Sequence, residues 1–566
     1  MARTRKELQV NERHIYQTEL TQCPHCGAPL VAQRHYQWRK TVQHLDQVVY
    51  VASQGKICRN AQCPHPGQVY SAAAAQRETV PGCTYGLDVI VQVGWWREQE
   101  HLNRVQIHGR LRERSVQLSE REVDHLYAHY QVLQACAARL DKARLTQLVA
   151  EHGGLIISLD GLAPEGAAEQ LWVVREVQTD TVLVVGWLPR VNHETLAALL
   201  QPVAALELPL LATVSDKEGC VKKALTTVWP DVPHQWCQAH YVGNAMKPIY
   251  ARDSALKTEL RQQIRAAVRA SVGEVLTDST ESDFSPQLVG GLAVTEPAAP
   301  AAAPAAATRE QVVRALAHDL QQALARQGRA PRVLSGLPLW ADLQALRDTL
   351  AQCLQVAEEP HLRQWYTALE AHLPAYAPAF AEVQQAQDWV TAIAAILDQP
   401  LPTATDPGVG GDAVALDLAH HLGRVADLAD LPPWLTHFRD DLLRLSARYW
   451  SGLFHCYDQV GLPATNNAHE SLFGQTKRQL RRQRGISELR EALLRHGAWL
   501  VFRPEATSPE QLQADLAQVS WAEYATERAR YDRRQAQFHQ RSRWRHHRDA
   551  VLQQRLADWV EATSTC

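Results

Sequence analysis

Two apolar runs that each end in an aspartate constrain the fold of this chain most strongly. Residues 155–160 read Leu-Ile-Ile-Ser-Leu-Asp, and residues 210–216 read Leu-Leu-Ala-Thr-Val-Ser-Asp. Short runs rich in Leu, Ile and Val are typical of strands whose two faces are both covered. A carboxylate at the end of such a strand points into the crevice at the sheet edge. We therefore expect Asp160 and Asp216 to reach one shared site.

The segment between the two aspartates predicts a specific order of elements. Leu171–Val177 and Val182–Leu188 are rich in β-branched residues and are separated by a polar turn. A helical pattern follows from about His193 to Val203. The expected order is therefore β-β-β-α-β, with an acid on the first and the fourth strand.

A third acid, Glu470, follows Thr465-Asn466-Asn467-Ala468-His469 at the start of an expected helix. Three converging carboxylates can hold two hard divalent cations, which prefer oxygen ligands. Such a pair of ions can align and stabilise an in-line displacement at phosphorus. The chemistry suggested is the cutting and joining of phosphodiester bonds.

Each acid also has a structural interpretation. An aspartate at a strand end often forms a turn or caps the next helix. Asn467 and Glu470 have the spacing of a capping box, in which Glu470 would only stabilise the helix start. Glu218, close to Asp216, is the main rival for a role as a metal ligand.

The order of these motifs resembles the ribonuclease-H-like core of the DDE transposases, and more closely the Mutator-like transposases and their bacterial insertion-sequence relatives. In that group a Cys-x-x-His follows the second aspartate, as Cys237 and His240 follow Asp216 here. The group also carries basic residues on the helix of its catalytic glutamate. The matching positions after Glu470 are Gly474, Lys477, Arg478, Arg481, Arg482 and Gly485.

The resemblance implies a DNA transposase that uses two Mg²⁺ or Mn²⁺ ions. Asp160 would bridge both ions, and Asp216 and Glu470 would each complete one coordination sphere. The implied partners are transposon ends, target DNA and further copies of the chain in a homodimer or larger assembly. A DNA-binding regulator that has lost catalysis and a ribonuclease-H-type nuclease without strand transfer remain alternatives.

Four cysteines near the N-terminus predict a structural zinc site of the zinc-ribbon type. Cys23 and Cys26 form a tight knuckle, and Cys58 and Cys63 offer two more thiolates after two strand-like runs near 36–42 and 48–52. Because four residues separate Cys58 from Cys63, His65 is an alternative ligand. A redox-active Cys-x-x-Cys is the competing interpretation, although no thioredoxin-like pattern surrounds it.

The next segment predicts three short helices at about 87–98, 102–112 and 119–129, with a capping box from Ser119 to Glu122. They resemble a helix-turn-helix, in which the third helix would enter the major groove. Arg110, Arg112 and Arg114 would then lie near phosphates. A plain helical connector is the alternative.

More than two hundred residues separate Asp216 from Glu470, so we expect an all-α insertion that contains an Ala/Pro-rich linker near 286–307. Trp450 is a candidate platform for stacking on a base, or a core residue. Cys237 and His240 are either half of a second zinc site, with His455 and Cys456 as the suggested other half, or packing residues. Eight arginines in 528–548 suggest a tail that grips DNA or a second protomer.

The expected fold is thus a multidomain α/β protein with an interrupted ribonuclease-H-like core. The expected domains are a zinc ribbon (1–80), a helix-turn-helix-like domain (81–150), the first part of the core (151–250), the all-α insertion (251–460), the second part of the core (461–505) and basic C-terminal helices (506–566).

Composition places the chain among soluble proteins. It has 566 residues and a formal net charge of −3, so any DNA-binding charge has to be local. No apolar run is long enough for a membrane span, and the basic start leads into polar sequence rather than an apolar signal core. We expect a cytoplasmic protein without a membrane partner, and its eleven cysteines are therefore not expected to form a disulfide framework.

Overall fold

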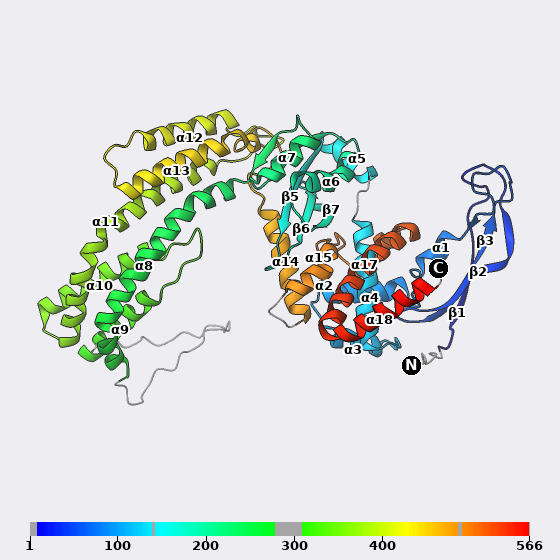
Figure 1. The fold of residues 1–566 in the computed structure, drawn as a ribbon, viewed down its shortest axis with the longest axis horizontal. Helices are drawn as coiled ribbons and strands as arrows, with labels where there is room; N and C mark the ends of the chain where they lie inside the picture. Colours follow the sequence, from blue (N-terminus) through cyan, green and yellow to red (C-terminus); the bar gives the residue numbers. More distant parts are fainter. Residues whose placement is uncertain (1–7, 139–141, 278–307, 485–488, 565–566) are drawn as a thin grey trace, which may run out of the picture. The chain divides into compact units, whose positions relative to one another are not determined.

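The computed structural model describes residues 8–138, 142–277, 308–484 and 489–564 (Figure 1). The chain is a mixed α/β protein with two sheets, and it divides into two compact units. Unit 1 comprises Met1–His234 and Asn466–Cys566, and unit 2 comprises Gln235–Thr465. The Ala/Pro-rich linker at 286–307 and Gly485 lie outside the described residues. The finer domain boundaries stay predictions.

The N-terminal sheet of unit 1 is built on one long hairpin. β2 (Val31–Gln43) and β3 (Val48–Ile57) pair antiparallel, which confirms the two expected strands and extends both. β1 (Glu12–Gln17) pairs parallel with β3, and β4 (Val69–Tyr70) pairs with its other end. Inward-facing valines of β2 and β3 pack against α1 (Ala73–Arg77) and its flank. The hairpin thus separates the two pairs of cysteines.

A charged network joins this sheet to the helices that follow. His44, at the end of β2, lies 3.3 Å from Glu78 and 3.0 Å from Asp88. Burial by itself would lower the pKa of His44, but its hydrogen bonds to Asp88 and Glu78 outweigh burial and raise the pKa to about 9. The side chain is 15% exposed, so solvent screens these contacts little. His44 is therefore a cation at neutral pH.

This network makes stability depend on pH. Because the folded pKa of His44 lies above the usual value of about 6.5, its contribution is complete below about pH 6.5 and is lost as the pH rises through 9. We expect the wild type to lose about 3 kcal/mol of unfolding free energy between pH 6.5 and 9.5 from this group. Denaturant unfolding of His44→Gln should give a flatter profile over this range. Parallel profiles for the two proteins would contradict the assignment.

Three helices follow the sheet, and they confirm the expected ones. They are α2 (Leu87–Glu98), α3 (Arg104–Glu113) and α4 (Glu120–Ala137). Ser119 caps α4 in a complete capping box with Glu122, as its spacing predicts. Asn103 forms a second capping box at the start of α3. Glu120 and Asp124 on α4 pair with Arg104, and Asp124 also pairs with Arg97. These acids therefore serve the helix packing.

The second sheet lies where the two aspartates predict it. Its strands are β5 (Leu155–Leu162), β6 (Gln170–Glu176), β7 (Thr181–Leu188), β8 (Leu210–Ser215) and β9 (His234–Trp236), in the spatial order β7-β6-β5-β8-β9. β5 pairs antiparallel with β6 and parallel with β8. With α6 (His193–Ala204) between β7 and β8, the expected β-β-β-α-β order is confirmed.

Both faces of this sheet are covered. Leu155, Ile157 and Leu159 belong to a core with α5 (Lys142–His152), α6 and α7 (Gly219–Val228). Leu171 and Val173 of β6, which point to the other face, belong to a core with helices α2 to α4 and the C-terminal helices. Coverage of both faces is why the strands are nearly continuous apolar runs.

The C-terminal part of unit 1 is helical. It contains α14 (Asn467–Arg484), α15 (Arg490–Leu500), α16 (Pro509–Leu516), α17 (Trp521–His546) and α18 (Arg548–Ser564). Helix α17 is packed into the fold as far as Phe538: Tyr531 and Phe538 are buried, and Arg534 lies 2.7 Å from Glu169. Some of the arginines in 528–548 therefore serve the packing of unit 1, and the expected grip of this segment on DNA or on a second protomer stays a prediction.

Unit 2 is formed by helices in its described residues from Gln238 onward. They are α8 (Gln238–Thr277), α9 (Arg309–Ala325), α10 (Gly336–Val356), α11 (Pro360–Leu397), α12 (Gly411–Ala426) and α13 (Pro433–Tyr449), followed by two 3₁₀ turns. The long helices α8 and α11 pack side by side (Figure 1). None of the helices described in either unit combines the length and apolar character that a membrane crossing requires.

Candidate functional site

Asp160 lies inside β5 rather than at its end. The strand continues to Leu162, and Asp160 pairs with Val173 of β6. Its half-buried carboxylate accepts a hydrogen bond of 2.7 Å from the backbone N–H of Gly161. Because side chains alternate along a strand, Asp160 points to the same face as Ser158. That face is opposite to the one that Leu159 covers.

Asp216 follows the last residue of β8 directly. The register pairs Ser158 with Val214 and Leu159 with Ser215, so Asp216 takes the position next to Asp160 as the two parallel strands continue. Asp216 is half-buried, and its backbone carbonyl accepts a bond from the N–H of Glu218. The register therefore places the two aspartates at neighbouring positions on the same face of the sheet.

Helix α14, which carries Glu470, is bonded to β5 beside Asp160. The Asn466 side-chain amide donates to the Leu159 carbonyl at 3.2 Å. The His469 Nε2 atom lies 2.9 Å from the Ser158 hydroxyl, and both side chains are buried. Burial first, and then the charge of Arg175, lower the pKa of His469 to about 3, so the ring is neutral. These bonds fix the start of α14 against the strand of Asp160.

Glu470 is exposed in the first turn of α14 and shares a helix face with Lys477 and Arg481. Positions 470, 474, 477 and 481 fall on one side of an α-helix. Arg478, Arg481 and Arg482 are exposed, Lys477 is half-buried, and none of them has a carboxylate partner among the described residues. A band of uncompensated positive charge thus extends from Glu470 along α14.

The start of α14 differs from the expected capping box. The helix begins at Asn467, which places Asn466 at the capping position in front of it. Asn466 uses its amide to bond β5. The predicted structural role of Glu470 as the partner of an Asn467 cap therefore does not match the observed helix start.

The three acids have the donor set for hard cations, which bind carboxylate oxygens. In the described chain the oxygens of Asp160, Asp216 and Glu470 do not form a group within 4.8 Å of one another. Like charges repel at short range, and a pair of divalent cations would remove that repulsion. The residues fit Mg²⁺ or Mn²⁺ by chemistry, and their role as ligands stays a prediction.

The four N-terminal cysteines do come together. The sulfur atoms of Cys23, Cys26, Cys58 and Cys63 all lie within 4.8 Å of one another, with Cys23 to Cys63 at 3.8 Å and Cys26 to Cys58 at 3.7 Å. A hydrogen bond from the Tyr70 hydroxyl is the main cause that lowers the pKa of Cys23 to about 6. This cluster has the ligand number and type of a structural zinc site.

His65 is not needed as a replacement ligand. Its backbone N–H donates to Cys63 at 3.4 Å, and its ring lies against His25 with 4.4 Å between centroids. The turn at Gly27, which has a φ of +70°, lets the first pair of cysteines close on itself. The structure therefore confirms that Cys58 and Cys63 lie in one cluster with Cys23 and Cys26.

The arginines of the helix-turn-helix-like segment are exposed, but two of them also cover an aromatic ring. Arg110 and Arg114 lie 5.5 and 5.9 Å from the ring of Trp96, and Arg110 also pairs with Glu100. Arg112 is exposed on the last turn of α3. A role for these residues near DNA phosphates stays a prediction.

Two further sequence candidates lie in unit 2. Cys237 is buried just before α8, and the His240 Nδ1 atom is 3.4 Å from its sulfur. Cys456, which with His455 is the suggested other half of a zinc site, accepts a hydrogen bond of 3.5 Å from the Gln238 side-chain amide. Trp450 is half-buried and packs edge-on against Phe454 at 5.1 Å.

Sequence reasoning gave no role to Ser158, Asn466 or His469. Ser158 lies two residues before Asp160, and Asn466 and His469 lie four residues and one residue before Glu470. No local sequence pattern shows that Ser158 and His469, which are 311 positions apart, are in contact. The one available signal was that these residues are polar although they occupy strand and helix positions where buried residues are usually apolar. Buried polar side chains usually have a hydrogen-bond partner.

Comparison with known proteins adds little to this geometry. No family model matches the chain, and no curated protein matches it. Among solved structures, it is similar to the Drosophila P element transposase strand transfer complex, with a TM-score of 0.27 and 10% sequence identity over 77% of this chain and 91% of that one. A likeness at this level establishes neither fold nor activity.

Proposed function

We propose that the chain is a DDE-type DNA transposase with a ribonuclease-H-like core in unit 1 and an all-α insertion in unit 2. The observation that carries the proposal is the pair of bonds that tie the Glu470 helix to the strand of Asp160. A helix start held there by two buried side chains is what a third ligand to a shared site requires. Local sequence motifs alone would not supply this link.

In this proposal Asp160, Asp216 and Glu470 hold two Mg²⁺ or Mn²⁺ ions. When bound, such ions would activate the attacking oxygen and stabilise the leaving oxygen of a phosphodiester displacement. Asp160 and Asp216 fix the site on the sheet, and Glu470 completes it from α14. Lys477, Arg478, Arg481 and Arg482 would hold the phosphate backbone from the same helix, because cations there favour a polyanion.

The four-cysteine cluster would bind one structural Zn²⁺ in this proposal. The N-terminal sheet has a small core, formed by five buried residues. Small domains of this kind often need a metal to be stable. A zinc-bound ribbon would then present its hairpin to DNA or to a partner.

A DNA-binding regulator without catalysis is the second candidate. The separation of the three acids, whose oxygens do not form one close group in the described chain, favours it. Both candidates bind DNA, so binding alone does not distinguish them. Strand cleavage does.

The proposal is tested with the reading frame and its native flanking DNA on one plasmid. We expect excision products with free 3′-hydroxyl ends, and joining of these ends to target DNA, in Mg²⁺ or Mn²⁺ but not in EDTA. Specific binding to the flanks without any cleavage in either metal would favour the regulator. Cleavage without joining would favour a nuclease.

Removing the bonds that hold α14 should slow cleavage without weakening DNA binding. In the double variant Ser158→Ala with Asn466→Ala, two hydrogen bonds to β5 are lost, which costs about 2 kcal/mol of unfolding free energy. We expect single-turnover cleavage to fall by about a hundredfold, because small displacements of a catalytic group have effects of this size. Ser471→Ala, an exposed position on α14, is the matched control. Equal cleavage by the double variant and the control would contradict this positioning role.

Helix α18 offers an apolar face for the second copy that a transposase assembly needs. Leu552, Leu556, Trp559 and Val560 are 47%, 65%, 68% and 53% exposed, and their spacing places them on one side of the helix. Exposed apolar residues in such a stripe are typical of an interaction surface. We propose that a second copy of α18 covers them.

The charges of α18 favour this partner in an antiparallel arrangement. Its first half carries Arg548, Asp549 and Arg555, with a net charge of +1, and its second half carries Asp558 and Glu561, with a net charge of −2. Two antiparallel copies would therefore bring opposite charges together. We expect the wild type to be a dimer by light scattering and Leu556→Glu with Trp559→Glu to be a monomer. Gln554→Glu, on the opposite side of the helix, should leave the dimer intact, and a dimeric double variant would rule out this interface.

A further inference from the structure

A groove in unit 1 has the charge and the hydrogen-bond donors of an anion site. It has a volume of about 860 Å³ and is lined by residues of α2, α3, α4, α14, α15 and α17. We call it the α4–α17 groove. It is separate from Asp160, Asp216 and Glu470, none of which lines it.

The lining of the α4–α17 groove carries more positive than negative charge. Four arginines line it, namely Arg97, Arg104, Arg495 and Arg528. Its two acids are already paired, because Asp124 bonds Arg97 and Arg104, and Asp532 bonds Arg528 at 3.1 Å. Three histidines add further donors and no negative charge. Within the lining itself, positive charge exceeds negative charge by two with the histidines neutral. Outside the lining, Glu120 lies 3.5 Å from Arg104 and Glu491 lies 3.9 Å from Arg495.

Two buried side chains in the lining have donor atoms that no described group accepts. Gln131 is 2% exposed, and its Nε2 atom is buried without a hydrogen-bond partner in the described chain. Arg97 is 8% exposed, and the same holds for its Nε atom. A buried N–H without an acceptor is costly, so each such group points to an acceptor that binds there. A ligand rich in acceptor oxygens would satisfy both.

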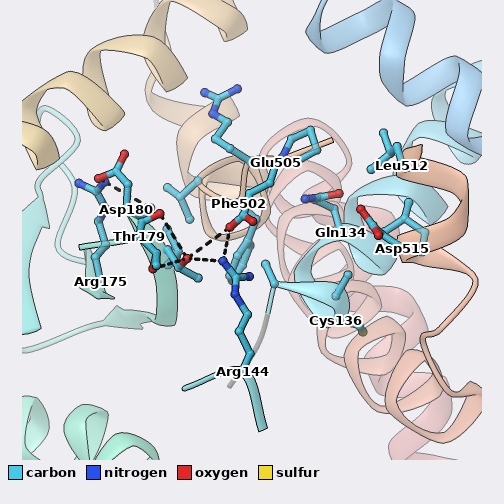
Figure 2. Close-up of a pocket in the computed structure, with 18 of the residues that line it drawn as sticks. Gln134, Cys136, Arg144, Arg175, Thr179, Asp180, Phe502, Glu505, Leu512 and Asp515 are labelled. Atoms are coloured by element: carbon cyan, nitrogen blue, oxygen red, sulfur yellow. Dashed lines mark hydrogen bonds and ion pairs between the residues drawn. The ribbon is translucent and has the colours of Figure 1, made fainter. Parts of the chain in front are cut away.

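A second pocket of similar size differs from the α4–α17 groove in the balance of charge in its lining. This pocket has a volume of about 890 Å³, and Figure 2 shows part of its lining. Arg144 bonds Glu505, and Arg175 bonds Asp180. Its four basic residues are matched by four acids in the lining. The second pocket therefore has no surplus charge to attract an anion.

We infer that the α4–α17 groove binds consecutive phosphates of a DNA strand. This inference rests on the proposed function, which supplies DNA as the polyanion, and it assigns residues to DNA that the motifs do not include. The guanidinium groups of Arg104 and Arg495 contact phosphate oxygens, and Arg97 and Gln131 donate from the floor of the groove. Because these donors reach only the backbone, the binding is independent of base sequence.

The experiment measures the binding of a labelled DNA duplex as a function of salt. In Arg104→Gln with Arg495→Gln, two phosphate contacts are lost, so the slope of log K against log salt should fall by about two. We expect affinity to fall at least about tenfold at moderate salt. Arg314→Gln, an exposed charge of α9, is the control and should behave as the wild type. An unchanged slope and affinity in the double variant would overturn the inference.

A second variant protects the test against misfolding. His539 is exposed at the groove, so His539→Glu adds a negative charge without removing an ion pair. It should weaken DNA binding, whereas His318→Glu on α9 should not. Competition with inorganic phosphate and with RNA of the same sequence identifies the ligand. Preference for free phosphate or for RNA over DNA would overturn the inference as stated.

These outcomes are independent of the catalytic proposal. If the wild type does not cleave DNA but the groove variants bind DNA more weakly than the wild type, the assignment of the groove stands and the catalytic proposal is wrong. If the wild type cleaves DNA and the groove variants bind DNA as the wild type does, the catalytic proposal stands and the assignment of the groove is wrong.

Discussion

Replacing any one of Asp160, Asp216 and Glu470 by its amide is expected to abolish DNA cleavage. Each substitution removes a charged oxygen ligand but keeps the shape of the side chain. We expect the cleavage rate to fall by about a thousandfold or more, which corresponds to about 4 kcal/mol of lost transition-state stabilisation. DNA affinity should change little, since the backbone contacts come from other residues. Single-turnover cleavage of a labelled oligonucleotide in Mn²⁺ measures the effect.

Glu218→Gln is the matched control for the three amide variants. Glu218 is an exposed acid two residues after Asp216, and it is the main rival for the ligand role. We expect this variant to cut DNA as the wild type does. Loss of cleavage in Glu218→Gln together with full activity in Glu470→Gln would transfer the third ligand to Glu218 and contradict the assignment.

Replacing Cys58 by serine is expected to unfold the N-terminal sheet. The residue is fully buried in the cluster of four sulfurs, and structural zinc sites in small domains contribute on the order of 10 kcal/mol to folding. The wild type should contain one zinc per chain by elemental analysis, and the variant should contain none. Hydrogen exchange should then show loss of protection in β2 and β3.

Cys353→Ser separates this effect from the loss of any cysteine. Cys353 is a half-buried residue of α10, outside the cluster. Its replacement should change neither zinc content nor protection of the N-terminal sheet. A zinc-free wild type that still protects β2 and β3 would show that the cluster does not need a metal to fold.

The sheet in unit 1 was predictable because its strands are local in the sequence. β5 to β8 are short apolar runs bounded by turn residues, and coverage of both faces explains why they are apolar throughout. The cysteine cluster was predictable for a similar reason, since knuckle spacing limits where the thiols lie. β1 was missed because its residues Glu12, Arg13 and His14 are polar and exposed or half-buried.

The arrangement of the candidate site could not be predicted in the same way. The bond between Ser158 and His469 joins residues 311 positions apart, and no local pattern reports such a contact. The arginines of α17 show the same limit. Arg530 and Arg534 looked like ligands for DNA, but they bond the Val185 carbonyl and Glu169 within the fold. Charge is visible in a sequence, whereas its partner is set by tertiary packing.

The most direct test of the central claim is to locate Mn²⁺ in crystals of the protein bound to DNA by anomalous diffraction. The account predicts two Mn²⁺ ions, with Asp160 as a ligand to both and with Asp216 and Glu470 as ligands to one each. It also predicts that Asp160→Asn crystals lose both ions. Mn²⁺ bound away from these three carboxylates, or bound equally in Asp160→Asn, would contradict the account.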